Sequence, residues 1–258
     1  MLTQNSRKIL HPPGSDRLAE ELDDFLDSMP GVYRREHDTD EIRTHWELVA
    51  RRAASLAHVE GMRYRVRPGR WICVVTDDRP GLLSLLSAAI AANGLDIQSA
   101  RAYCRSRAQF PDEAVDFFCV RQQNHALDHE LKPGQLDSIR SSIESLLLGE
   151  LDVASLARRG AARSQLLSED ANAAYFQDTP ASDLLIVRSA DHPGLLLKIT
   201  LTLFREGLTI RRSNVATFHD MASDEFELSE LDGSPLTEAR KASVVRSVLA
   251  VLAQRIGS

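Results

Sequence analysis

The stretch that decides the fold of this chain occurs twice, first as Asp78-Arg79-Pro80-Gly81-Leu82-Leu83 and again as Asp191-His192-Pro193-Gly194-Leu195-Leu196. The copies lie 113 residues apart, and each follows an apolar run and opens an apolar segment. Both segments close at a Gly-Leu pair with the same spacing, Gly94-Leu95 and Gly207-Leu208. A match of this length without a gap indicates that one structural unit is used twice.

The composition sets broad limits on the class of protein. With 258 residues, of which 43% are hydrophobic, the chain is long enough for two ordinary globular domains. Its formal net charge of -6 does not favour binding to nucleic acid or to an anionic membrane. No segment has the apolar length of a membrane helix, and residues 1–10 lack the apolar core of a secretory signal. The three cysteines have no paired spacing, so we expect a reducing, cytoplasmic location.

Residues 1–60 are predicted to form a helical region. Ser15 or Asp16 begins a first helix that ends at Met29-Pro30-Gly31, and Asp38 or Thr39 begins a second that Gly61 ends. Apolar residues at helical spacing support both helices: Leu18, Leu22, Phe25 and Leu26, then Ile42, Trp46, Val49, Ala53 and Leu56.

Each repeat reads as strand, strand, helix, strand, strand, helix. The predicted strands are 62–67, 71–76, 95–105 and 115–120, then 173–177, 183–189, 208–218 and 225–228. The predicted helices are 80–93 and 135–148, then 193–206 and 237–256, with Pro80 as the first helical residue and Gly94 just past the end. Because no strand pattern follows the last helix, residues 173–177 should supply the edge of the second repeat, unless that strand is shared.

This order predicts an α+β fold with two ferredoxin-like (βαββαβ) sandwiches in tandem, the fourth strand of each moved to the front. The predicted divisions are a helical region at 1–60, a first domain at 61–150, a linker at 151–171 and a second domain at 172–258.

A strand that ends in Asp-x-Pro-Gly-Leu-Leu, followed by an apolar helix, Gly-Leu and a strand, resembles an ACT domain, a module that senses small molecules, usually amino acids. Two in tandem resemble the C-terminal regulatory region of the bacterial PII uridylyltransferase/uridylyl-removing enzymes. The resemblance extends upstream to Phe25-Leu26-Asp27-Ser28-Met29-Pro30-Gly31-Val32-Tyr33 and to the helix around His45-Trp46-Glu47-Leu48. It covers most of residues 20–256.

The catalytic motifs of that family have no match in this chain. A Gly-Ser motif followed by paired aspartates is missing, and the one His-Asp pair, His37-Asp38, falls in a predicted charged loop rather than in a metal-binding helix. A nucleophile elbow, a Gly-rich phosphate loop and a Gly-x-Gly-x-x-Gly motif are also missing. We therefore expect no catalytic residues, no metal and no cofactor, and a protein that is not an enzyme.

The two Pro-Gly turns are the predicted ligand sites. A helix N-terminus suits a carboxylate, glycine lets a ligand approach the backbone, and an aspartate suits an ammonium group. By resemblance to ACT domains, the ligand lies between such a turn and the start of the second strand, often across a domain interface. The predicted site residues are Asp77, Asp78, Arg79, Pro80, Gly81, Leu82, Leu83, Asp96 and Ile97, with Asp191, His192, Pro193, Gly194, Leu195, Leu196, Thr209 and Ile210.

A purely structural role of the turns stays open, in which the aspartate caps the helix and Pro-Gly makes the turn. The two sites need not be equal, because Asp77 has Ala190 as its counterpart and Arg79 has His192. The first repeat helix is apolar on more than one face, which favours burial against the other repeat or a second subunit.

Other residue clusters favour structural roles. Arg63, Arg65, Arg67 and Arg70 suggest a solvated basic strand edge more than an RNA-binding surface, which would need exposed aromatic residues. His125, Asp128 and His129 suggest a polar loop more than a metal site. Cys73, Cys104 and Cys119 lie on predicted strands of one sheet, where packing is favoured over a three-thiol site.

The sequence thus predicts a non-catalytic amino-acid sensor, with glutamine as the first choice by resemblance alone. Expected partners are an amino acid and a second copy or a partner enzyme, with no nucleic acid and no membrane. Two alternatives stay open: a regulatory subunit of a separate nucleotidyltransferase that binds no small molecule, and an enzyme with an unrecognised site.

Overall fold

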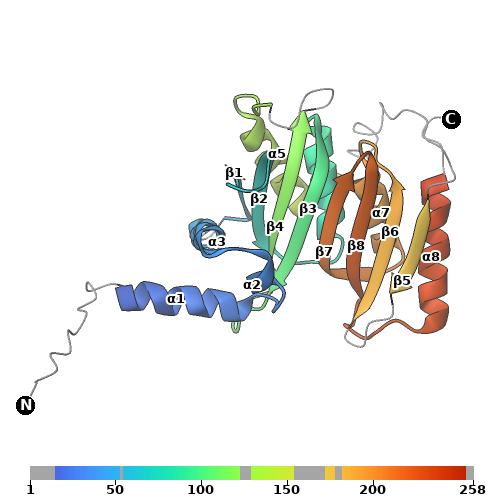
Figure 1. Ribbon diagram of the computed structural model, residues 1–258, viewed down its shortest axis with the longest axis horizontal. Helices are drawn as coiled ribbons and strands as arrows, with labels where there is room; N and C mark the ends of the chain where they lie inside the picture. The colour runs from blue at the N-terminus through green and yellow to red at the C-terminus, as the bar shows by residue number, and fades with distance from the viewer. Residues whose placement is uncertain (1–14, 53–54, 123–128, 154–171, 178–181, 254–258) are drawn as a thin grey trace, which may run out of the picture.

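The computed structural model describes residues 15–52, 55–122, 129–153, 172–177 and 182–253 (Figure 1). Three helices come first: α1 (Ser15–Ser28), α2 (Tyr33–Glu36) and α3 (Thr39–Arg51). The first repeat contains β1 (Ala57–Met62), β2 (Arg70–Asp77), α4 (Leu82–Ala92), β3 (Leu95–Arg105), β4 (Glu113–Gln122) and α5 (Gln135–Leu147). The second contains β5 (Ala173–Gln177), β6 (Asp183–Ala190), α7 (Leu195–Arg205), β7 (Leu208–Phe218), β8 (Met221–Glu230) and α8 (Glu238–Ala253).

All eight strands form one antiparallel sheet in the order β1-β2-β4-β3-β7-β8-β6-β5. Within each repeat this is the strand order of a ferredoxin-like sandwich whose fourth strand comes first in the chain, so the predicted α+β fold is confirmed. The two half-sheets join where β3 pairs with β7, from Ser99 opposite Ala216 to Tyr103 opposite Arg212. β5 lies at the free edge of the second repeat, as predicted.

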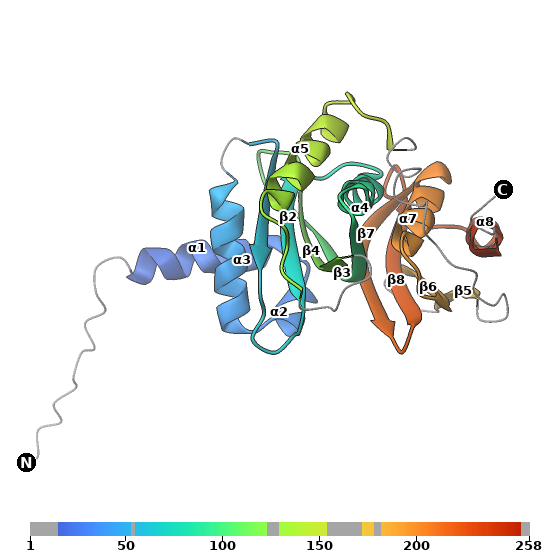
Figure 2. The ribbon, with the colours of Figure 1, turned by 90° about the horizontal axis from the view of Figure 1, so that it is seen from above.

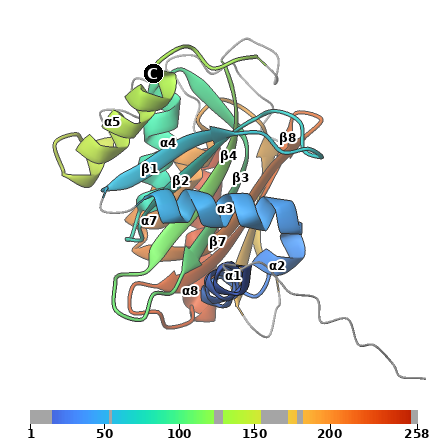
Figure 3. The ribbon, with the colours of Figure 1, turned by 90° about the vertical axis from the view of Figure 1, so that its left-hand side faces the viewer.

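Helices cover the two faces of the sheet unequally. On one face α5, α4, α7 and α8 lie in a row (Figure 2), and their apolar side chains form one core with both repeats. On the other face α1, α2 and α3 lie only over the first repeat, where a second core surrounds Tyr33 and Phe117 (Figure 3). Among the described helices, none combines the length and apolarity that crossing a membrane requires.

The apolar surplus of α4 is used between the repeats. Every residue from Leu82 to Ile90 is buried, and α4 lies against α5 on one side and α7 on the other. Burial of a helix on several sides explains why its apolar residues occupy more than one face.

The predicted strand at 62–67 is wrong, and so is the prediction that Gly61 ends a helix. α3 ends at Arg51, and Gly61 lies inside β1, where Met62 is opposite Trp71 of β2. Residues 63–69 therefore form the connection between these strands. The arginines that looked like one strand face contact acids instead: Arg65 lies 3.2 Å from Asp40.

The apolar stripe of the second N-terminal helix is also partly wrong. Ile42 is buried as predicted, but Trp46 and Val49 are only partly buried, and Leu56 is 48% exposed beyond the helix end. The buried face includes Glu41, His45 and Leu48 instead. Several predicted features, including Ala53, His125, Asp128, most of the linker and residues 1–14, lie outside the described residues.

Candidate functional site

Both Pro-Gly turns adopt the same conformation. Gly81 and Gly194 have φ angles of 79° and 83°, in the left-handed region that glycine tolerates best. Because that conformation cannot continue a helix, α4 and α7 begin one residue later, at Leu82 and Leu195. The prediction that Pro80 and Pro193 are the first helical residues is therefore wrong.

The carboxylates of the turns do not cap these helices. The N-cap residue of each helix is a glycine, which has no side chain, and the carboxylates of Asp78 and Asp191 accept the backbone N–H of Arg79 and His192, which precede the helices. The interpretation in which aspartate serves as a helix cap thus lacks its hydrogen bond at both turns.

The first turn opens onto a pocket that the second repeat completes. Residues 78–84 line one side, together with Asp116 of β4. Thr200 and Phe204 of α7 and residues 208–211 at the start of β7 line the other side. This pocket therefore includes Thr209 and Ile210, which the sequence paired with the second turn.

The second turn opens onto the corresponding pocket, which the first repeat completes. Asp191, His192 and residues 194–197 come from the turn and α7, and Asp224 comes from β8. Ser87 and Ala91 of α4 and residues 95–97 of β3 lie across from them. The antiparallel pairing of β3 with β7 brings the start of each strand to the other repeat's turn, which explains the exchange of Asp96 and Ile97 for Thr209 and Ile210.

Two predicted site residues have other contacts. Asp77 does not line these pockets, because its carboxylate lies 2.9 Å from Arg52 and 2.6 Å from Arg107. Those arginines also contact the buried Glu113, at the edge of a shallow hollow of about 440 Å³ beside α1 and α3. Arg79 lines the first pocket, and its Nη1 donates to the carbonyl of Leu147 at the end of α5.

Two buried carboxyl groups on the pocket floors were missed by the sequence reasoning. Asp116 is 3% exposed and lies opposite Val74 and Ala102, whereas Asp224 is 1% exposed and lies opposite Val187 and Val215. They are equivalent positions of the two repeats. The sequence does contain a matching pair, Asp116-Phe117-Phe118 and Asp224-Glu225-Phe226. The connection between β7 and β8 is shorter than that between β3 and β4, so this pair does not have the 113-residue spacing of the turns and the match is hidden.

Burial makes these carboxyl groups hard to ionise. It raises the pKa of Asp224 to about 8, with the nearby Asp191 adding to the effect and the N–H of Ala216 opposing it. Burial raises the pKa of Asp116 well above its usual range, and Asp78 adds to that. The turn residues Asp78 and Asp191 have their pKa raised by burial too. Each pocket thus has one carboxyl on its turn and one on its floor.

The two pockets differ above their glycines. A Cβ atom added to Gly81 would lie 2.7 Å from the ring of Phe204, whereas at Gly194 it would meet no atom within 4 Å. Ala91 occupies the position in the second pocket that corresponds to Phe204. The free space is small in both, about 30 Å³ in the first and about 20 Å³ in the second, which is room for water but not for an amino acid without side-chain movement.

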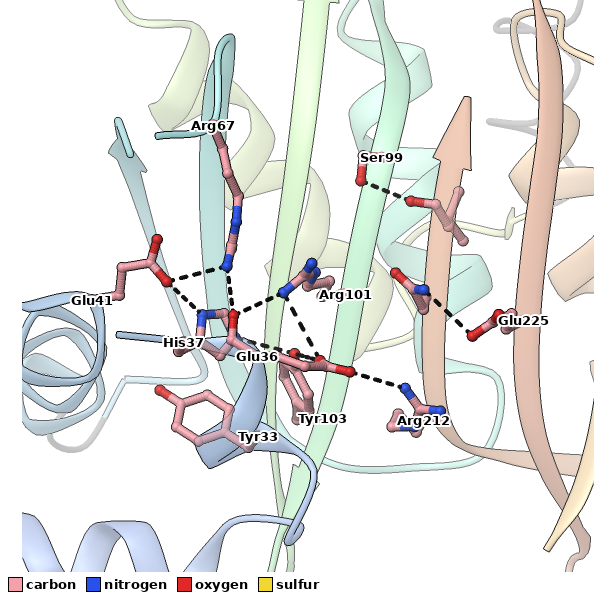
Figure 4. A network of polar contacts seen from close by, with 12 residues as sticks. Tyr33, Glu36, His37, Glu41, Arg67, Ser99, Arg101, Tyr103, Arg212 and Glu225 are labelled. Atoms are coloured by element: carbon pink, nitrogen blue, oxygen red, sulfur yellow. Dashed lines mark hydrogen bonds and ion pairs between the residues drawn. The ribbon is translucent and has the colours of Figure 1, made fainter. Parts of the chain in front are cut away.

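A polar network missed by the sequence reasoning joins the N-terminal helices to both repeats (Figure 4). His37 lies in the charged connection between α2 and α3, as predicted, but it is only 6% exposed and contacts Glu41 (3.0 Å) and the hydroxyl of Tyr103 (3.1 Å). The carboxylate of Glu36 accepts the Tyr103 hydroxyl and lies 3.4 Å from Arg212 of β7. Burial lowers the pKa of His37 to about 3 and that of His45 to about 2, so both imidazoles are neutral. Asp38 accepts the backbone N–H of Glu41 and caps α3.

The cysteines do not form a site. None of the three is in a disulfide. Cys73 and Cys119 are buried, and Cys104 lies half-buried beside Asp112. Within the described ranges, no group of three histidine, cysteine or acidic side chains is placed to hold a metal ion.

The chain is similar to part of three larger bacterial enzymes. It is 29% identical over 238 residues to the bifunctional uridylyltransferase/uridylyl-removing enzyme of Phenylobacterium zucineum (strain HLK1), covering 91% of this chain and 24% of that enzyme. It is 28% identical over 250 residues to the enzyme of the same name from Caulobacter vibrioides (strain NA1000 / CB15N), and the match covers 91% of this chain and 25% of that enzyme. It is 29% identical over 240 residues to the enzyme of the same name from Gluconobacter oxydans (strain 621H), and the match covers 88% of this chain and 24% of that enzyme.

The chain therefore spans about a quarter of the length of these relatives. The predicted resemblance to these enzymes is confirmed. The length of the match is consistent with a segment of them such as the C-terminal region. No model of a known protein family matches the chain.

Proposed function

We propose that this chain is a non-catalytic regulatory module that binds an amino acid between its two repeats, with glutamine as the first choice. One observation carries the proposal: both copies of the duplicated turn open onto pockets that the other repeat completes. ACT domains hold their ligands in such places, and the relatives are named for a uridylyltransferase activity. The choice of glutamine rests on the resemblance alone.

The residues around each turn suit both charged ends of an amino acid. The start of α4 or α7 offers backbone N–H groups and a partial positive charge to a carboxylate, without a side-chain cap in competition. Asp78 or Asp191 offers a carboxylate to the ammonium group. These two features lie on the same turn, so one small zwitterion contacts both.

Regulation follows from the position of the ligand between the repeats. A ligand that contacts residues of both repeats favours the arrangement in which those residues are closest, by its difference in affinity for the two arrangements. Glu36 bonds to Tyr103 of the first repeat and Arg212 of the second, so the N-terminal helices respond to the same arrangement. We propose that these helices pass the state to a second copy or to a partner enzyme in the cytoplasm.

A second function is favoured by a different observation. The pockets hold little free space, and the Phe204 ring lies against Gly81. A regulatory subunit that contacts a nucleotidyltransferase and binds no small molecule needs no open pocket. In that case the Pro-Gly turns serve only to start the two helices.

Thermal-shift measurements with each of the twenty amino acids test the proposal. We expect glutamine or another amino acid to raise the melting temperature of the full chain, and Gly194→Asp to abolish the shift. Aspartate tolerates the left-handed conformation better than most residues, and Gly194 has open space around it, so the substitution adds a negative charge at the turn without a clash. Gly81→Asp tests the first pocket, where the new side chain must first displace the Phe204 ring.

Gly134→Asp is the matched control. Gly134 also precedes a helix, has a φ of 73° and has open space around it, but it lines neither pocket. Its variant should keep the shift. No response to any of the twenty amino acids would support the interaction subunit instead.

A further inference from the structure

Asp224 is a buried acid with an unused oxygen. Its side chain lies on the floor of the second pocket, and the residue is 1% exposed. The carboxyl receives the N–H of Ala216, yet its Oδ1 atom has no hydrogen-bond partner among the described residues. A buried oxygen without a partner is costly, which points to a donor that arrives with a ligand.

The charges around Asp224 are mostly acidic. Asp191 faces it from the β6–α7 turn, close enough to raise its pKa. Asp96 lies in the same pocket and is paired with Arg121 at 2.8 Å. Burial lowers the pKa of His192 on the turn, and Lys198 of α7 lowers it further. Asp191 accepts hydrogen bonds from Thr217 and from the N–H of His192, and Arg121 lies close enough to oppose the rise that burial causes in its pKa. One guanidinium therefore stands against three carboxyl groups, and within the described structure no cation is bonded to the pair Asp191–Asp224.

The pair Asp191–Asp224 suits an organic amine better than a metal ion. Within the described ranges no three carboxylate, imidazole or thiol groups are close enough together to ligate a metal. An alkylammonium group has three N–H donors and spans a wider gap between oxygen atoms. An amine therefore suits this pair of carboxyl groups better than a divalent ion.

We infer that the second pocket binds the protonated amine of its ligand between Asp191 and Asp224, and that the ammonium group replaces the carboxyl proton of Asp224. The O–H bond of the Asp224 carboxyl breaks, its proton goes to solvent, and an N–H of the ammonium group donates to the carboxylate that remains. The ligand keeps its charge, so binding releases a proton. This inference rests on the proposed function and adds which pocket and which residue recognise the amine.

The first pocket lacks two of these features. Within the described residues, no buried oxygen of its floor residue Asp116 lacks a hydrogen-bond partner, and the Phe204 ring lies against Gly81. The ring thus occupies space that a ligand would take. The arginines do not distinguish the pockets, because Arg211 opposes the rise that burial causes in the pKa of Asp78, as Arg121 does for Asp191. Asp116 provides the matched position for comparison.

Isothermal titration calorimetry on the full chain tests the inference. Each of the twenty amino acids is titrated at pH 7 in phosphate and in Tris, which differ in ionisation enthalpy. For any amino acid that binds, we expect the two buffers to report release of about one proton per ligand, because Asp224 is mostly protonated at that pH. The same molecule with hydrogen in place of its amino group should bind roughly tenfold or more weakly and release no proton.

Asp224→Asn should weaken binding roughly tenfold or more and abolish proton release, since the amide has no proton to exchange. Glu225→Gln, next to Asp224 but outside both pockets, should leave both quantities unchanged, and Asp116→Asn tests the floor of the first pocket. If circular dichroism shows that Asp224→Asn does not fold, the inference is still tested on the wild-type chain, by the comparison of the two buffers and by the binding of the molecule without its amino group.

The outcomes separate the two proposals. If none of the twenty amino acids binds, the proposed function is overturned and this inference with it. Binding without proton release, or with the des-amino molecule bound equally well, overturns the inference and leaves an amino-acid sensor standing. Binding that Asp116→Asn weakens and Asp224→Asn does not would assign the amine to the first pocket and also overturn it.

Discussion

The two repeats share one topology but differ on the face that lies away from α4 and α7. In the first repeat, β4 places Val115, Phe117 and Cys119 on that face, and all are buried beneath the N-terminal helices. In the second, the equivalent positions of β8 are Ser223, Glu225 and Glu227, and these residues are exposed or only partly buried.

This difference teaches which part of the molecule needs the N-terminal helices. An apolar sheet face must be covered, and a polar one is stable in water. The helices belong structurally to the first repeat, and they reach the second through a few polar contacts such as that of Glu36 with Arg212. A signal from the pockets to these helices is therefore carried by side-chain contacts and not by a shared core.

The largest expected effect separates the two faces. Phe117→Ala should lower the free energy of unfolding by about 4 kcal/mol, because a fully buried ring is removed. Glu225→Ala, at the equivalent position, should change it by less than about 0.5 kcal/mol. Urea denaturation measures both. Phe118→Ala and Phe226→Ala are controls that face the common helix layer and should cost the same as each other; equal costs for Phe117 and Glu225 would contradict the comparison.

The buried carboxyl groups should make the repeats alike in their response to pH. Asp224 holds its proton to about pH 8 in the folded chain but loses it near pH 4 when unfolded. The stability linked to this proton is complete below about pH 4 and is lost as the pH rises toward 8. Asp224→Asn should therefore gain about 4 kcal/mol over the wild type between pH 5 and pH 8, at about 1.4 kcal/mol per pH unit.

Denaturant titrations at several pH values measure this gain. Asp116→Asn should gain in the same direction, since burial raises the pKa of Asp116 as well. A pH response that is lost in one variant and kept in the other would show that the two floors are not equivalent.

A smaller effect distinguishes the two glycines. Gly194→Ala should cost about 1 kcal/mol, because alanine is strained at positive φ. Gly81→Ala should cost about 2 kcal/mol, because the same strain is joined by a contact with the Phe204 ring. Thermal unfolding of both variants and of Gly134→Ala, which has open space, provides the comparison; identical costs at all three glycines would argue against a ring packed on Gly81.

The smallest expected effect is that of Phe204 itself. Its side chain is 43% exposed, so Phe204→Ala should cost about 1 kcal/mol or less. In that background the cost of Gly81→Ala should fall to that of Gly194→Ala, which a double-mutant cycle measures. Calorimetry of Phe204→Ala should show a second amino acid bound per chain if the Phe204 ring closes the first pocket. An unchanged stoichiometry would mean that Arg211 or Asp116, and not the ring, makes the two pockets different.

Local pattern decided much of the architecture. The boundaries of β3, β5 and β7 match the prediction, because alternation and a following turn are local properties of the chain. The exceptions share a cause in tertiary contacts. Arg65 and Arg67 alternate like strand residues but contact Asp40 and Glu41 of the N-terminal region. His37 falls between charged residues but is buried, with a hydrogen bond to Tyr103, and His45 is buried between Tyr33 and Tyr64.

The sequence by itself determined that one unit is used twice, and that its turn begins an apolar helix, because repetition and helix starts depend on neighbouring residues. Only the tertiary structure decided which strand completes each pocket, since antiparallel pairing of β3 with β7 carries the start of each strand to the opposite turn. It also decided that Asp116 and Asp224 form the pocket floors. Residues far apart in the chain meet there, and the free energy of ionising a carboxyl depends on all the atoms that surround it.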